Sequence, residues 1–204
     1  ETLFALGDAV TANGLWRGLP AWSQRQHHGL ALAAEWLGIE ESAVAHWEAL
    51  VRQHLETPPG TPTPDWLPHA VVHFADLLRT GRDPERVTDL LRRAASRLAG
   101  NEAVLAAWID HLEEHKQERD LLRAADSARR AARSAPDSPR YKLLLARALA
   151  GAGDHENAFR AAADALALSS DPEVHTLFDR VVHERARAAR AGPAALAALE
   201  EAAR

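Results

Sequence analysis

Apolar residues recur at intervals of three and four along most of the chain, and no long run alternates with period two. This spacing gathers apolar side chains on one face of an α-helix. Glycines, prolines and cap residues divide the pattern into about eleven helices. Their expected bounds are about 2–13, 20–37, 40–55, 68–80 and 84–100, four helices between 102 and 170, and finally 172–190 and 193–203. The sequence therefore predicts an all-α fold.

Cap residues and prolines mark the expected helix boundaries. Asp83-Pro84, Ser138-Pro139 and Asp171-Pro172 each combine an N-cap residue with a proline suited to the first helical turn. Asn101 is a further N-cap residue. Gly192-Pro193 is expected to break the last long helix, because proline removes a backbone donor and clashes with the preceding turn.

A proline-rich stretch divides the chain. Four prolines fall within residues 57–64, which forbids helix and favours an extended connection. We interpret 57–65 as a stiff linker, with a proline-rich docking motif as the alternative. The expected organisation is an N-terminal segment of about three helices over 1–56, helical repeats over 66–170 and capping helices over 171–204.

Two alanine pairs indicate an internal repeat. Ala124 and Ala158 are 34 residues apart, as are Ala131 and Ala165, while Pro136 and Pro172 are separated by 36. A period near 34 is that of the tetratricopeptide repeat (TPR), in which two antiparallel helices bury their shared face by stacking on neighbouring pairs.

The stretch from Leu105 to Pro172 resembles the TPR family. In a first repeat opening at Leu105, the resemblance rests on Trp108, Leu112, the turn residue Asp120, Ala124, Ala131 and Pro136. In a second repeat opening at Pro139, it rests on Leu145, Ala146, the Gly153-Asp154 turn, Ala158, Phe159, Ala165 and Leu166. The chain departs from the family pattern at His111, His115, Arg119 (for the turn glycine), Lys142 and Ser170. The resemblance implies a right-handed α-α superhelix, a TPR-like helical solenoid, acting as a non-catalytic protein-interaction scaffold.

In this family the first helix of each pair lines a concave groove that binds a peptide or helix of a partner protein. Carried over position by position, the partner-binding residues are Ile109, Asp110, Glu113, Lys116, Arg140, Leu143, Leu144 and Arg147, with Ala106 and Gln117 at two further groove positions. Ile109 and Glu113 stand where some family members carry residues that clamp a peptide carboxylate, so a C-terminal tail is not the expected ligand. The mixture of acids, arginines and leucines favours a mixed-charge helix or extended segment.

Composition narrows the classes of partner. A formal net charge of −5 argues against a nucleic acid or an anionic membrane surface, which need a basic stripe. The absence of cysteine excludes disulfides, zinc–thiolate sites and thiol catalysis. No apolar run approaches the ~20 residues of a membrane span. Arginine and alanine richness favours a bacterial source. We expect a cytoplasmic protein, with a periplasmic location after signal removal and homo-oligomerisation left open.

The histidines raise the question of a metal. His111-Leu112-Glu113-Glu114-His115 matches H-x-x-E-H, the inverted zinc-peptidase string, with its histidines four apart on one helical face. The two histidines fall at packing positions of the repeat, and no third ligand is marked out downstream. His69 and His73 have the same spacing. We interpret both pairs as packing residues and expect no metal, no cofactor and no catalytic residue, since phosphate-loop, dinucleotide and nucleophile-elbow motifs are also absent.

Three rival functions remain at this stage. The chain lacks a starting methionine, which is compatible with a helical accessory domain of a larger enzyme such as a glycosyltransferase or sulfotransferase. A complete α/α-toroid enzyme needs about twelve helices in a much longer chain, so length disfavours it. A histidine-based metal binder would be stabilised by zinc, since a ligand that binds only the folded state raises its stability.

Overall fold

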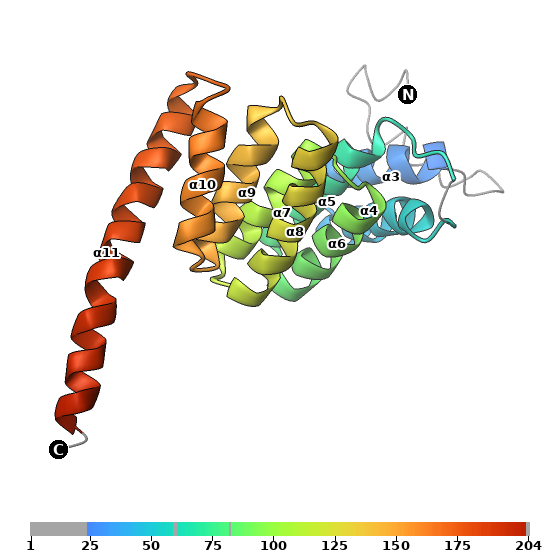
Figure 1. The fold of residues 1–204 in the computed structure, drawn as a ribbon. Helices are drawn as coiled ribbons and strands as arrows, with labels where there is room; N and C mark the ends of the chain where they lie inside the picture. Colours follow the sequence, from blue (N-terminus) through green and yellow to red (C-terminus); the bar gives the residue numbers. More distant parts are fainter. Residues whose placement is uncertain (1–23, 59–60, 82, 203–204) are drawn as a thin grey trace. The chain divides into compact units, whose positions relative to one another are not determined.

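The computed structural model describes residues 24–58, 61–81 and 83–202, and it describes side chains from residue 27 to residue 190. Within these ranges the chain forms nine α-helices and no β-strand (Figure 1). They are α3 (Gln24–Trp36), α4 (Glu40–Leu55), α5 (Leu67–Thr80), α6 (Pro84–Arg97), α7 (Glu102–Glu114), α8 (Glu118–Ser134), α9 (Pro139–Gly151), α10 (His155–Leu166) and α11 (Pro172–Ala202). None of the described helices combines the length and apolar composition that a membrane-spanning segment requires.

The count differs from the expected eleven for two reasons. The helix expected at 2–13 lies outside the described residues. The break expected at Gly192-Pro193 does not occur, because α11 continues through it to Ala202. An internal proline removes one backbone hydrogen bond, but the surrounding alanines have the highest helix propensity and sustain the helix on both sides.

The described residues fall into two compact units, with the division between Leu98 and Ala99. In the first unit α3 packs against α4, α4 against α5 and α5 against α6. Its core includes Leu30, Trp47, Leu50, Phe74 and Leu91, each at most 3% exposed. The helix pair α5–α6 thus lies in the same compact unit as α3–α4.

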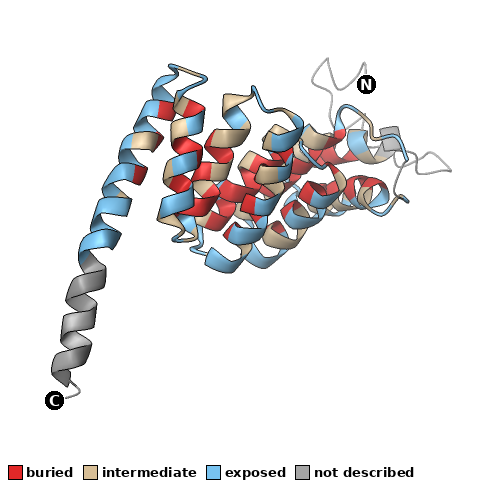
Figure 2. Ribbon diagram, viewed as in Figure 1, coloured by how far each residue is buried: buried red, intermediate tan, exposed pale blue. Residues whose placement is uncertain are grey.

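The second unit is a succession of helical hairpins. The pairs α7–α8 and α9–α10 are followed by α11, and α9 also packs on α7 and α8 (Figure 1). Figure 2 shows the buried positions of these helices turned toward their neighbours. Alanines such as Ala124, Ala128, Ala158 and Ala162 are fully buried in α8 and α10. Small side chains there let helix axes approach closely, which is how a chain poor in aromatic residues fills this core.

The caps predicted at Asp83 and Asn101 are present. The Ser138 side chain, also predicted as a cap, makes no capping hydrogen bond, and Asp154, predicted as a turn residue, caps α10. The side chains of Asp83, Asn101 and Asp154 each accept a hydrogen bond from the backbone N–H three residues later. Pro84 and Pro139 occupy the first helical turns of α6 and α9. The helix predicted over residues 40–55 has the same bounds as α4.

The α7–α8 and α9–α10 hairpins are offset by 37 residues, and not by the predicted 34. The N-cap positions of α7 and α9 are Asn101 and Ser138, 37 residues apart, and those of α8 and α10, Gln117 and Asp154, have the same separation. The structural equivalent of Ala124 is therefore Ala161, and that of Ala128 is Ala165; all four are buried. Alanines recur in both helices at helical spacing, so an offset of 34 residues matches buried alanines as well as the observed offset of 37 does.

The first predicted turn also lies elsewhere. Asp120 and Arg119 are inside α8 rather than in the turn, which is formed by His115, Lys116 and Gln117. Lys116 has a left-handed φ of 51°. The turn predicted at Gly153-Asp154 is present, with Gly153 at φ 79°. Counting back 37 residues from Gly153 gives Lys116, whereas the 34-residue register pointed to Arg119.

Candidate functional site

The predicted groove residues fall into two groups on α7 and α9. Ile109, Leu143 and Leu144 are at most 5% exposed and belong to the packing between helices. The sequence analysis predicted that these three residues contact a partner directly, but side chains buried this deeply cannot reach one. The charged members Asp110, Glu113, Arg140 and Arg147 keep some exposure, and Lys116 is exposed in the α7–α8 turn.

Arg147 is held by two acids of the preceding hairpin. Its guanidinium pairs with the carboxylates of Asp110 and Glu113 on α7, and its side chain is only 19% exposed. Burial acts to lower the pKa of Arg147, but the hydrogen bonds to Glu113 and Asp110 outweigh it and hold the pKa above its usual value. Arg147 therefore joins α9 to α7 rather than standing ready for a partner.

Arg140 makes a similar but more exposed link. Its guanidinium bonds to Glu173 on α11 at 2.6 Å and to Glu102 on α7 at 3.1 Å. The hydrogen bonds to Glu173 and then Glu102 raise the pKa of Arg140. Acids and arginines on α7, α9 and α11 thus neutralise one another. The face they form carries both positive and negative groups and no excess of one sign.

The described part of the first unit contains a pocket that the sequence did not indicate. Its volume is about 510 Å³. The walls come from α3, α4, the start of α5 and the residue before it, and the lining residues are His28, Leu32, Trp47, Leu50, Trp66, His69, Ala70 and His73. We call this the α3–α5 pocket. Its lining is apolar apart from three imidazoles, the composition typical of ligand and anchor-residue pockets.

The pocket wall is held by one acid. The Glu35 carboxylate accepts a hydrogen bond from the indole N–H of Trp47 and lies 3.0 Å from Nε2 of His73. The Trp47 ring also meets His73 edge-on, with centroids 5.1 Å apart, and meets His28 in the same way at 5.5 Å. These contacts tie α3, α4 and α5 together and fix the Trp47 indole, which lines the pocket.

The rim is more accessible. Trp66 is 39% exposed and His69 is exposed. On its other side Trp66 stacks edge-on against His54, with ring centroids 4.9 Å apart. The sequence signals here are the His69–His73 spacing and the neighbouring histidines at 27 and 28, and neither reveals that three helices converge around the pocket.

One group of three side chains in the described residues brings metal-ligating atoms together. These are His111, Glu114 and His115, whose ligand atoms lie within 4.8 Å of one another. The sequence showed this string, but we expected no metal because the two histidines fall at packing positions. His111 is indeed fully buried, while Glu114 and His115 are exposed.

Comparisons with known proteins bear on the fold. Neither a protein-family model nor a curated protein sequence matches the chain. Residues 41 to the end of MamA from Desulfovibrio magneticus RS-1 superpose with a TM-score of 0.50 at 14% identity, covering 80% of this chain and 92% of that one. A second structure, MamA MSR-1 C2, gives 0.49 at 17% identity, over 83% and 91% of the two chains. With the hairpin succession described above, the chain has the predicted all-α fold, a TPR-like helical solenoid.

Proposed function

We propose that this chain is a non-catalytic protein-binding module that captures a segment of a partner through the α3–α5 pocket. The pocket itself is the observation that carries the proposal. It has room for one or two large side chains, and its walls are mainly apolar. In protein interfaces a few buried aromatic or aliphatic anchors supply most of the affinity.

The pocket chemistry favours a particular kind of anchor. Trp47 and Trp66 offer ring faces and edges to an aromatic or branched aliphatic side chain. The imidazoles of His28 and His69 can donate or accept hydrogen bonds to the backbone of the same segment. The expected ligand is therefore a short helix or extended segment of another protein with one large apolar anchor.

The charged face of the second unit is the second element of this proposal. Asp110, Lys116 and Arg140 keep exposed side chains there. Exposed charges contribute mainly to the rate and orientation of association rather than to affinity. We therefore assign them a steering role, while the affinity comes from the pocket.

The test is a pull-down from lysate of the source organism with four baits. The first is the wild-type chain, and the second is Trp66→Ala with His69→Ala, which removes the pocket rim. The third is His69→Glu, an exposed substitution that places a charge at the rim with little effect on folding. The fourth is Trp36→Ala, a matched control, because Trp36 is 68% exposed on α3 and does not line the pocket.

Partners retained by the wild type and by Trp36→Ala, but lost by both rim variants, would support the proposal. Circular dichroism of all four baits checks that the helices are intact. A partner held equally by all four baits would exclude the pocket as its binding site. No enrichment on any bait would contradict the proposed function.

A further inference from the structure

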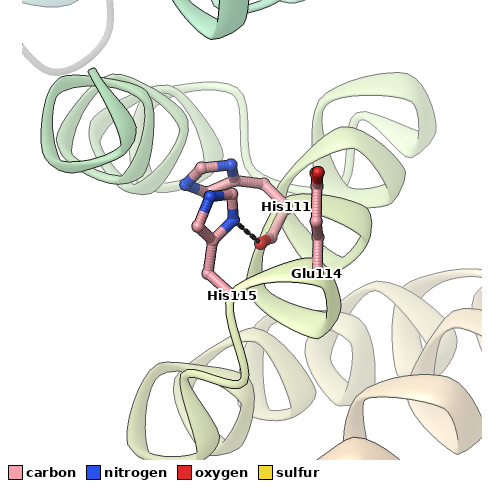
Figure 3. A group of neighbouring side chains, drawn as sticks. All are labelled: His111, Glu114 and His115. Atoms are coloured by element: carbon pink, nitrogen blue, oxygen red, sulfur yellow. Dashed lines mark hydrogen bonds between the residues drawn. The ribbon is translucent and has the colours of Figure 1, made fainter. Parts of the chain in front are cut away.

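The C-terminal turn of α7 presents an imidazole pair and a carboxylate side by side. His111, Glu114 and His115 are at positions i, i+3 and i+4, which places them on neighbouring parts of one helix face. The imidazole centroids of His111 and His115 are 4.3 Å apart, and Glu114 lies beside them (Figure 3). All three side chains are therefore close enough to contact the same bound ion.

A backbone contact fixes which nitrogen of His115 is the ligand. Nδ1 of His115 lies 2.9 Å from the carbonyl oxygen of His111, drawn as the dashed line in Figure 3. A carbonyl only accepts, so Nδ1 carries the proton and Nε2 keeps its lone pair. Metal-bound histidines commonly donate their other ring N–H to a carbonyl in this way, which sets the tautomer and the ring orientation.

The two adjacent glutamates of the string have different roles. Glu113 is already engaged by Arg147, and Arg180 approaches it at 3.9 Å. Glu114 is exposed, and no basic side chain in the described ranges lies within ion-pair distance of its carboxylate. Its carboxylate is therefore available beside the two imidazoles.

We propose that His111, Glu114 and His115 form a site for a zinc-class divalent ion at the end of α7. Two imidazoles and one carboxylate are a ligand set suited to Zn²⁺. Ligands bound at about 2.0–2.2 Å around a tetrahedral ion stand roughly 3.3 Å apart, so side-chain rotations must bring together ligand atoms that now lie within 4.8 Å of one another. His111 is buried and His115 is exposed, so an ion would reach the site from the solvent side, past His115.

The site would have three protein ligands and one open position. An open fourth position is filled by water or by a group from another molecule. The ion would also join the last turn of α7 to the His115–Gln117 turn that leads into α8. Zinc should therefore stabilise the second unit against unfolding.

The chain carries its own matched control on α5. His69 and His73 have the same four-residue spacing as His111 and His115, but Val72 stands where the second string has Glu114. Within the described residues, His69 and His73 do not form a group of three metal ligands with any other side chain. If a histidine pair alone were enough to bind zinc, the α5 pair and the α7 pair would both bind it.

The experiment is calorimetric titration of the metal-free chain with Zn²⁺, together with Co²⁺ absorption as a readout of coordination geometry. We expect one ion per chain and a visible tetrahedral Co²⁺ spectrum. The variant His115→Ala should weaken zinc binding on the order of 100-fold, and Glu114→Gln by about 10-fold. These values follow from the 10- to 100-fold cost of losing even an outer partner of a metal ligand. Both residues are exposed, so neither change threatens the fold.

The double variant His69→Ala/His73→Ala should bind zinc as the wild type does. Wild-type affinity in both His115→Ala and Glu114→Gln would overturn the proposal. So would loss of binding in the α5 double variant, or no saturable binding by the wild-type chain. Because the pocket is in the other unit, these outcomes are independent of the partner-binding test.

Discussion

Lys116 and Gly153 occupy equivalent turns of successive helical hairpins and share a left-handed backbone conformation. Their φ angles are 51° and 79°. Both precede the N-cap of the second helix in the hairpin, Gln117 before α8 and Asp154 before α10. Glycine adopts this conformation without a steric penalty, whereas a lysine does not. The α7–α8 turn is therefore under strain that the α9–α10 turn avoids.

The variant Lys116→Gly should stabilise the protein. Relief of the left-handed conformation is expected to outweigh the extra flexibility of glycine in the unfolded chain, with a net gain of about 0.5–1 kcal/mol. Urea denaturation measures this free energy of unfolding. The reverse change, Gly153→Ala, should lower the free energy of unfolding by about 1 kcal/mol or more. A Cβ at position 153 would meet no neighbouring atom, so the left-handed φ alone disfavours the alanine. If both variants raised the free energy of unfolding, or both lowered it, the assignment of strain to the Lys116 turn would be refuted.

Arg147 and Arg140 should differ in their effect on stability. Removing the half-buried Arg147 leaves Glu113 and Asp110 without their shared cation, so Arg147→Ala should cost about 1–3 kcal/mol. Arg140→Ala removes an exposed link and should cost less than about 1 kcal/mol. Thermal melts of the two variants provide the comparison. An Arg147→Ala variant as stable as the wild type would mean that its ion pairs add nothing.

This difference also changes how the charged face can be tested. Arg147→Glu would place a third acid next to Asp110 and Glu113, so a loss of partner binding could reflect damage to α9. Arg140→Glu is the cleaner steering variant, since Arg140 is more exposed. It should change the rate of association with the partner and the salt dependence of that rate while leaving helix content unchanged, as surface plasmon resonance at two salt concentrations can show.

His54 should make the first unit sensitive to acid. Burial first, and the charge of Arg97 second, lower the pKa of His54 in the folded protein. Below the unfolded-state value of about 6.5, the unfolded chain therefore binds the proton more readily than the folded chain does. Stability contributed by neutral His54 is complete above that pH and falls as the pH drops toward the folded-state pKa.

The variant His54→Phe tests this assignment. It keeps an aromatic ring against Trp66 but cannot be protonated. Denaturation at a series of pH values between 5 and 8 should show a shallower acid slope than the wild type. Some slope should remain, because burial also lowers the pKa of His27. If the free energy of unfolding of the variant fell with pH as steeply as that of the wild type, the acid sensitivity would come from groups other than His54.

The helices could be predicted largely because their signals are local. Cap residues such as Asp83 and Asn101, and the proline at the start of α9, act within a few residues of their own position. The repeat register could not be fixed in the same way. Buried alanines repeat every three or four residues within α8 and α10, so a shift of one turn preserves the pattern while moving the turn residue from Lys116 to Arg119.

The sites depend on contacts that local patterns do not encode. Family position placed Ile109 and Leu143 in a groove, but neighbouring helices bury both. Arg140 and Arg147 pair with Glu102 and Asp110, acids 38 and 37 residues earlier in the chain, and such pairs form only when the hairpins stack. The α3–α5 pocket joins residues from His28 to His73 with no shared motif, so only the packing of three helices reveals it.

The most direct test of the central claim is site-specific photo-crosslinking in cells of the source organism. A benzoylphenylalanine introduced at position 69, on the pocket rim, should give a discrete covalent adduct with another protein. The same probe at position 36, exposed on α3 outside the pocket, should not. Mass spectrometry of the position-69 adduct should find the crosslink within a short segment next to a large apolar residue. Absence of an adduct at position 69, or the same adduct from position 36, would contradict the claim that the pocket binds a partner protein.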